Sequence, residues 1–187
     1  MNFFERTLIN LFEGGVNFVV IGGVAISAHG SAHVTFDLDI CYDRSPENIL
    51  RLVDGLKPCH PRLRGAPAEL PFLFDSETIR RGLNFTLTTD PADINLLSEV
   101  AGIGHYKEAL ARSTTLELFG RPCHVLSLEG LIAAKRAAGR PRDLAVLPEL
   151  EALHELETLQ FEKADESGQP GKDSHNDREK PKGIRPH

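Results

Sequence analysis

The chain has 187 residues, of which 41% are hydrophobic and 6% aromatic. This length supports one hydrophobic core, and so few aromatic side chains argue against a stacking surface for single-stranded nucleic acid. The net charge is −6, and residues 1–160 carry all of the acidic excess, so we expect no duplex DNA among the partners, because duplex binding needs a broad basic face.

The N-terminal part of the sequence alternates helix and strand patterns. Residues 2–15 place apolar side chains at helical spacing before a Gly-Gly pair, which predicts a helix. Residues 17–23 are a short apolar run that ends in glycines, which predicts a buried strand. We then expect a short helix over 24–30, a strand over 33–43, and a helix over 45–56 whose first residue, a serine, is the N-cap.

The middle of the sequence combines a long loop with two hairpins. Residues 58–80 contain four prolines and show no period, so they predict a loop with about one helical turn. Alternation around Asp-Pro predicts a hairpin over 83–98. A helix over 105–112 and a second hairpin over 114–127 complete this part.

The C-terminal part is predicted to be helical. Residues 127–139 form a helix between a capping serine and a terminal glycine, and a last helix runs over 141–161. Residues 162–187 contain only two aliphatic side chains, so we expect a disordered tail there. The predicted fold is an α/β (α+β) domain over residues 1–161, with a small mixed β-sheet flanked by helices.

Two features of the sequence address location and cysteine chemistry. The N-terminal residues contain neither a secretory signal nor an apolar run of membrane-spanning length, so we expect a cytoplasmic protein without a membrane partner. Cys41, Cys59 and Cys123 are odd in number and show no CxxC spacing, which argues against a disulfide framework and a zinc site.

Two carboxylates, Asp37 and Asp39, lie one residue apart in the predicted strand over 33–43. Because strand side chains alternate between faces, both acids project from one face, whereas Phe36, Leu38 and Ile40 share the other. Strands normally exclude aspartate, and two neighbouring carboxylates repel each other. The pattern is therefore typical of a divalent cation site, an acid–base pair, or an edge strand with one face in water.

A second predicted strand also presents polar residues opposite its apolar face. In "PADINLLS", Asp93 and Asn95 point away from Ala92, Ile94 and Leu96. Three carboxylates on two neighbouring strands would form a site for Mg²⁺, which prefers oxygen ligands. By itself, Asp93 is equally typical of a turn residue after proline.

A pair of glycines, Gly22 and Gly23, stands where the first strand passes into a helix. Backbone N–H groups at such a junction can hold phosphate. Close packing also explains a Gly-Gly pair at this place, and the spacing matches neither a dinucleotide fingerprint nor a Walker loop.

Taken in order, "IGGVAISAHG", "VTFDLDI", "ADINLL" and "LSLEGLIAAKRAAGRPRDLAVL" resemble the DNA polymerase β-like nucleotidyltransferase superfamily. Within it, the chain looks most like small bacterial proteins related to the AbiEii toxin component and to minimal nucleotidyltransferases. The resemblance covers residues 16–150 and leaves the loop at 58–80 and the tail unmatched.

The resemblance implies a role for five residues. Gly22 and Gly23 would bind the triphosphate of an NTP through backbone N–H groups. Asp37 and Asp39 would ligate two Mg²⁺ ions, and Asp93 would complete the metal site and help to deprotonate the attacking hydroxyl. All three aspartates are thus expected to be catalytic.

Further residues follow from the same resemblance. Lys135 lies where related proteins carry a helix lysine that faces the site, so it would neutralise phosphate or brace an acid; a solvated lysine is the alternative. Asp143 is expected to brace the helix junction beside Arg140 and Arg142. Related sequences carry an arginine at the position of His33, and a histidine is a poorer phosphate ligand.

The sequence therefore predicts a Mg²⁺-dependent nucleotidyltransferase that moves an NMP from an NTP to a hydroxyl of RNA, protein or a small molecule. The resemblance suggests a toxin–antitoxin setting, in which a tRNA end or a tyrosine of a partner protein is the acceptor. One alternative is an inactive, antitoxin-like module that binds a partner, which His33 favours. Another is a metal-dependent phosphohydrolase that uses the same acids.

Overall fold

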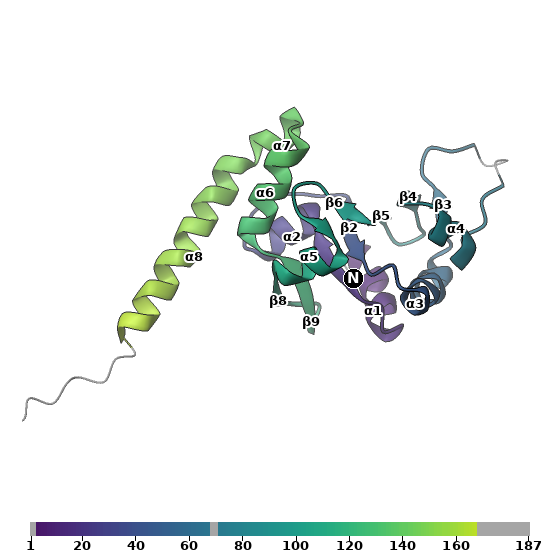
Figure 1. Cartoon of the computed structure of the whole chain (residues 1–187), viewed down its shortest axis with the longest axis horizontal. Helices are drawn as coiled ribbons and strands as arrows, with labels where there is room; N and C mark the ends of the chain where they lie inside the picture. The colour runs from purple at the N-terminus through teal and green to yellow at the C-terminus, as the bar shows by residue number, and fades with distance from the viewer. Residues whose placement is uncertain (1–2, 68–70, 168–187) are drawn as a thin grey trace, which may run out of the picture.

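The computed structural model describes residues 3–67 and 71–167, which build one seven-stranded mixed sheet with helices around it (Figure 1). The strand order is β3-β4-β5-β2-β1-β9-β8. These strands are β1 (Phe18–Ile21), β2 (Asp37–Tyr42), β3 (Arg62–Leu63), β4 (Asn84–Thr88), β5 (Asp93–Leu97), β8 (Ser113–Leu118) and β9 (Arg121–Leu126). A separate small hairpin pairs β6 (Glu99–Val100) with β7 (Gly104–His105). The predicted α/β class is confirmed.

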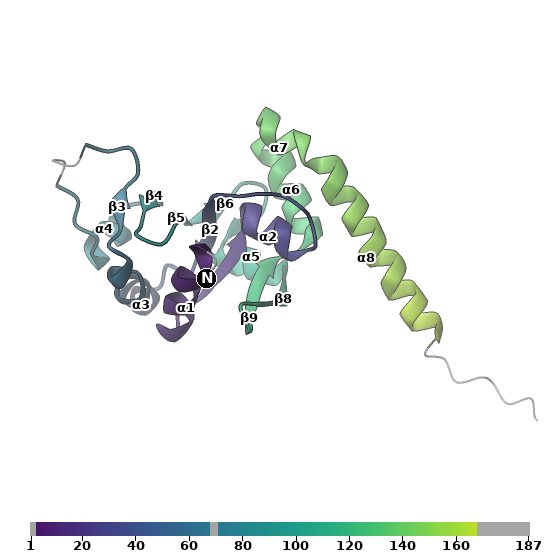
Figure 2. The ribbon, with the colours of Figure 1, turned by 180° about the vertical axis from the view of Figure 1, so that it is seen from behind.

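The described helices confirm most of the predicted ones. They are α1 (Phe3–Glu13), α2 (Gly22–Ala28), α3 (Pro46–Leu56), α4 (Ser76–Arg81), α5 (Tyr106–Ala111), α6 (Leu128–Ala138), α7 (Pro141–Ala145) and α8 (Leu147–Ser167), with a 3₁₀ turn over Lys57–Cys59. Helix α1 packs on α3, as the views from both sides show (Figures 1 and 2). The segment over 58–80, predicted as a loop with about one helical turn, contains the short strand β3 and all of α4 but its last residue.

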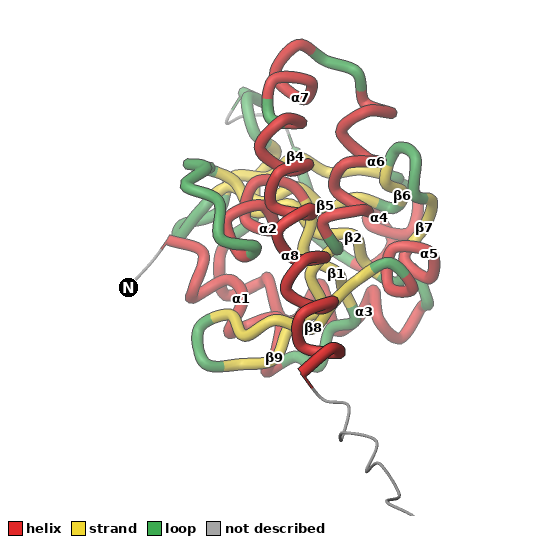
Figure 3. Tube along the Cα trace, turned by 90° about the vertical axis from the view of Figure 1, so that its left-hand side faces the viewer, coloured by secondary structure: helices red, strands yellow, loops and turns green. Residues whose placement is uncertain are grey.

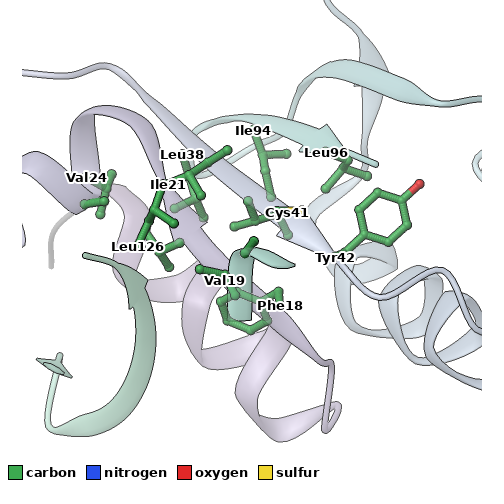
Figure 4. Packing of buried hydrophobic residues seen from close by; sticks show 14 of the residues in the cluster. Phe18, Val19, Ile21, Val24, Leu38, Cys41, Tyr42, Ile94, Leu96 and Leu126 are labelled. Carbon is green, nitrogen blue, oxygen red and sulfur yellow. The ribbon is translucent and has the colours of Figure 1, made fainter. Parts of the chain in front are cut away.

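The core lies around the central strands. All four residues of β1 are buried, and β2 pairs with β1 on one side and with β5 on the other. Side chains from these strands, from α2 and from β9 pack together (Figure 4), among them Val19, Ile21, Val24, Leu38, Ile94, Leu96 and Leu126. The hairpins β4–β5 and β8–β9 are antiparallel, as predicted.

Strand β2 corrects two expectations about the acid-bearing segment. It begins at Asp37 rather than at residue 33, because its pairing with β5 begins at Asp37 opposite Asp93. Phe36 therefore lies outside the strand and is 85% exposed, so the prediction that it shares the buried face was wrong. The edge-strand alternative was also wrong, because β2 lies in the middle of the sheet.

Capping differs between the two helices for which the sequence predicts a serine cap. The Ser127 hydroxyl accepts a hydrogen bond from the backbone N–H of Gly130 at the start of α6, as expected. Ser45 also stands at the N-cap position of α3, but its hydroxyl donates to the carboxylate of Asp43 and makes no side-chain cap. Asp43, two residues before Ser45, therefore takes the place of a backbone N–H of α3 as the partner of the Ser45 hydroxyl.

The C-terminal helix departs from the prediction at both ends. Residues 141–161 were expected to form one helix, but α7 ends before α8 begins at Leu147, because Pro148 has no N–H to continue the first helix. Helix α8 then reaches Ser167, so residues 162–167 are helical and not a disordered tail. No glycine or proline interrupts α8 after Pro148, which lets the helix propagate. The expectation for 168–187 falls outside the described residues.

Helix α8 runs from α7 along one side of the molecule and crosses in front of the sheet in the side view (Figure 3). Its far end lies away from the sheet in the two views from front and back (Figures 1 and 2). Within the described ranges, no helix combines the length and the apolar character that crossing a membrane requires.

Candidate functional site

The paired strands β2 and β5 bring the predicted acids together. Their parallel register places Asp37 beside Asp93 and Asp39 beside Asn95. Asp37 and Asp93 are each about one-third exposed. Further along β2, Cys41 is fully buried where α5 contacts the strand, so this face is covered at its Cys41 end and open at its Asp37 end. The four polar side chains form what we call the acid cluster: Asp37, Asp39, Asp93 and Asn95.

The glycine turn lies at the same end of the sheet. Gly22 opens α2 with a φ of 64°, and a Cβ atom there would overlap the carboxylate of Asp39. A Cβ atom on Gly23 would overlap the side chain of Thr35, whose hydroxyl donates to Asp37. Both glycines therefore let the backbone of α2 approach the DxD strand closely.

Arg64 and Asn95, which the sequence did not assign to the site, contact the three aspartates. Arg64 lies with its Nη1 3.1 Å from Asp93 Oδ2 and 3.6 Å from Asp37 Oδ2, and its Nη2 donates to Asn95 Oδ1 at 2.7 Å. The Asn95 amide donates to Asp37 at 3.0 Å and to Asp39 at 2.7 Å. The alternation of polar and apolar residues in "DINLL" already predicted that Asn95 lies on the same face as Asp93. Arg64, in contrast, lies in a segment without a hydrophobic period.

Burial raises the pKa of Asp39 above its ordinary value, and repulsion from Asp37 raises it further. The hydrogen bond from Asn95 and the positive charges of Lys135 and Arg64 act in the opposite direction without cancelling the effect. A carboxylate with a raised pKa gains most from an additional cation nearby, because the cation favours its ionised form.

A cavity of about 670 Å³ opens over this face of the sheet. Asp37, Asp39 and Gly23 line it, together with His33. Asp93 and Gly22 do not, although Gly22 borders a neighbouring cavity of about 160 Å³ with Asp39. The larger cavity also receives four basic side chains, from Arg64, Lys135, Arg140 and Arg142.

A second charged cluster, which we call the Asp143 brace, also lines the cavity. Asp143 is 1% exposed and accepts from Lys135 Nζ at 2.8 Å and from Arg140 Nε. Burial alone would raise the pKa of Asp143, but the hydrogen bonds from Lys135 and Arg140 outweigh it and hold the pKa below its ordinary value. Lys135 therefore braces an acid, one of the two roles expected for it, and Asp143 joins α6 to α7 as expected.

Arg142 differs from its neighbours. It is exposed at the cavity, and within the described part of the chain no ion pair joins it. It is therefore available to an anion that enters.

The donor chemistry of the acid cluster suits Mg²⁺, because carboxylate and amide oxygens are hard ligands. Among the residues that the structure describes, however, no three His, Cys, Asp or Glu side chains converge closely enough to hold a metal ion. Arg64 and Asn95 take up the oxygens instead. Since Mg²⁺ is commonly bound by one or two carboxylates plus substrate phosphates, Asp37 and Asp39 fit such a site once a triphosphate supplies the remaining ligands.

Comparison with known proteins adds no relative: the chain matches no protein-family model and no curated protein. The resemblance to nucleotidyltransferases therefore rests on the sequence motifs alone.

Proposed function

We propose that the chain is a Mg²⁺-dependent nucleotidyltransferase that transfers an NMP from an NTP to a hydroxyl group. One observation carries the proposal: the β2–β5 register and the Gly22 turn gather three aspartates at one end of the sheet, beside a cavity with four basic side chains. A cavity of about 670 Å³ lies within the range of small-molecule sites.

In the proposed reaction the hydroxyl oxygen attacks the α-phosphorus, and the bond from this phosphorus to the bridging oxygen breaks. Pyrophosphate leaves with the electron pair, and Asp93 accepts the hydroxyl proton. Mg²⁺ held by Asp37 and Asp39, with Asp93 completing the metal site, would stabilise negative charge on the entering and departing oxygens. The Gly22–Gly23 backbone and Arg142 would hold the triphosphate, which is chiefly a matter of positioning and charge.

The acceptor hydroxyl belongs in this proposal to RNA, a protein or a small molecule. The resemblance to toxin–antitoxin proteins favours a tRNA end or a tyrosine of a partner protein. The acidic excess of residues 1–160 opposes RNA binding, and Arg62, Arg80 and Arg81 are each paired with a carboxylate. An RNA acceptor would therefore rely on the basic side chains that line the cavity.

The test is NMP transfer from each labelled NTP in the presence of Mg²⁺ and candidate acceptors. We expect labelling of one acceptor by the wild type and its loss in Asp37→Ala. Asp54→Ala, an exposed aspartate on α3, is the matched control and should label normally. Equal labelling by the wild type and Asp37→Ala would contradict the proposal. Release of phosphate instead of pyrophosphate would indicate the phosphohydrolase.

A second candidate function is a non-catalytic, antitoxin-like module that binds a partner protein. It is favoured by the pairing of Arg64 with Asp37 and Asp93, which satisfies the acids without a metal ion. His33 in the cavity, in place of an arginine, points the same way. Calorimetry with Mg²⁺ and each NTP separates the two candidates, because the module would show no binding.

A further inference from the structure

Arg64 reaches the acid cluster from a different strand. It directly follows the edge strand β3, and its backbone N–H donates to the carbonyl of Thr86 on β4 at 3.0 Å. From this anchor the side chain extends across β4 and β5 to the carboxylates of Asp93 and Asp37. The backbone is thus held by the sheet, while the side chain is 31% exposed and faces the cavity.

The guanidinium of Arg64 places a positive charge between two of the aspartates. Its Nη1 lies between the carboxylates of Asp93 and Asp37, and its Nη2 bonds Asn95. Arginine stays protonated in proteins, so this charge is permanent. A divalent ion on Asp37 would meet it at short range and would be repelled.

A triphosphate changes this balance. Arginine binds phosphate oxygens with two parallel hydrogen bonds, so an entering nucleotide offers Arg64 a partner that replaces Asp37 and Asp93. The released carboxylates can then take Mg²⁺, which also uses phosphate oxygens.

We propose that Arg64 is a resident counter-cation that competes with divalent metal for Asp37 and Asp93 in the nucleotide-free protein and moves to the phosphates when a nucleotide enters. This inference rests on the proposed function and deepens it. Its consequence is a positive coupling between metal and nucleotide, in which each ligand strengthens the other by the same factor.

The test measures binding of Mn²⁺ alone, as a spin probe, by electron paramagnetic resonance. In Arg64→Gln we expect Mn²⁺ to bind about tenfold more tightly than in the wild type, because a unit charge a few ångströms away is removed. Arg64→Lys keeps the charge and should stay close to the wild type. Arg62→Gln is the matched control: this neighbour on β3 pairs with the exposed Asp90 and should leave Mn²⁺ affinity unchanged.

A non-hydrolysable NTP analogue completes the design. It should strengthen Mn²⁺ binding in the wild type and do so by a clearly smaller factor in Arg64→Gln. Arg64→Ala serves as a second neutral variant, and thermal unfolding identifies any variant that does not fold.

Unchanged Mn²⁺ affinity in both neutral Arg64 variants, or the same gain in Arg62→Gln, would overturn the inference. If the wild type still transfers NMP in that case, only the role of Arg64 fails. If no variant binds Mn²⁺ and no NMP transfer depends on Asp37, the proposed function fails with it.

Discussion

Two charged clusters border the same cavity, and they differ in how many cations each carboxylate contacts. In the Asp143 brace, one carboxylate that is 1% exposed accepts from two cations, Lys135 and Arg140. In the acid cluster, Arg64 pairs with two of the three carboxylates, Asp37 and Asp93, whereas Asp39 accepts from the uncharged amide of Asn95. The brace is therefore complete within the protein, whereas the acid cluster keeps surplus negative charge beside an open cavity. We infer that the first holds α6 and α7 together and that the second can accept a further cation.

The largest loss of stability is expected when the carboxylate of the Asp143 brace is removed. Asp143→Ala removes the buried partner of Lys135 and Arg140 and should lower the free energy of unfolding by about 3 kcal/mol, as when one member of a buried ion pair is lost. Chemical denaturation measures this change. Glu77→Ala, which breaks exposed ion pairs with Arg80 and Arg81, is the control and should cost far less. Equal losses in the two variants would contradict a structural role for Asp143.

The brace should also respond to acid. The pKa of Asp143 lies below its ordinary value of 3.8 in the folded protein, so its contribution to stability is present above pH 3.8. It is lost as the pH falls through the lower folded value. Asp143→Ala should therefore lose less stability than the wild type in this acidic range.

A smaller loss of stability is expected for Gly22→Ala, a change in the glycine turn that contacts the acid cluster through Asp39. The positive φ of Gly22 strains alanine by about 1–2 kcal/mol, and the added Cβ overlaps the carboxylate of Asp39. Gly30→Ala is the control, because Gly30 has a φ of 94° with open space around it. We expect both variants to lose stability and only Gly22→Ala to lose nucleotide binding, measured by calorimetry. Retained nucleotide binding in Gly22→Ala would argue against the turn as part of the site.

The smallest expected change is a gain in stability, and it comes from Asp39→Asn. The pKa of Asp39 is raised in the folded protein, so the native state binds its proton more tightly than the unfolded state. Stability therefore falls as the pH rises from the ordinary value of 3.8 through the raised folded value. Asp39→Asn should remove this dependence and slightly raise the melting temperature at pH 7. A lower melting temperature at pH 7 would show that the charge of Asp39 stabilises the fold.

Local sequence patterns predicted most helices and strands, whereas the exact start of a strand depended on its pairing with a neighbouring strand. Alternation placed Asp37 and Asp39 on one face, and serine and glycine marked the ends of α6. The start of β2 could not be predicted, because it depends on where β5 pairs with it. The same holds for Phe36, which is exposed because it precedes Asp37, the first residue of β2 that pairs with β5.

The candidate site was predictable to the extent that its residues lie in regular strands. Asp93 was placed by alternation in β5, and its position beside Asp37 required only that the two strands be neighbours. Arg64 belongs to a segment with four prolines and no period, so only the folded chain brings it to the acids. The double partnership of Asp143 likewise depends on how α7 packs against α6.

The central claim is that the acid cluster binds a divalent cation together with a triphosphate. Its most direct test is Mn²⁺ binding by electron paramagnetic resonance in the presence of a non-hydrolysable NTP analogue, with the wild type and Asp37→Asn compared at equal thermal stability. The account predicts tight Mn²⁺ binding by the wild type that depends on the analogue, and a weakening of at least about tenfold in the variant through the lost carboxylate charge. Equal binding in both proteins, or none in the wild type, would contradict it.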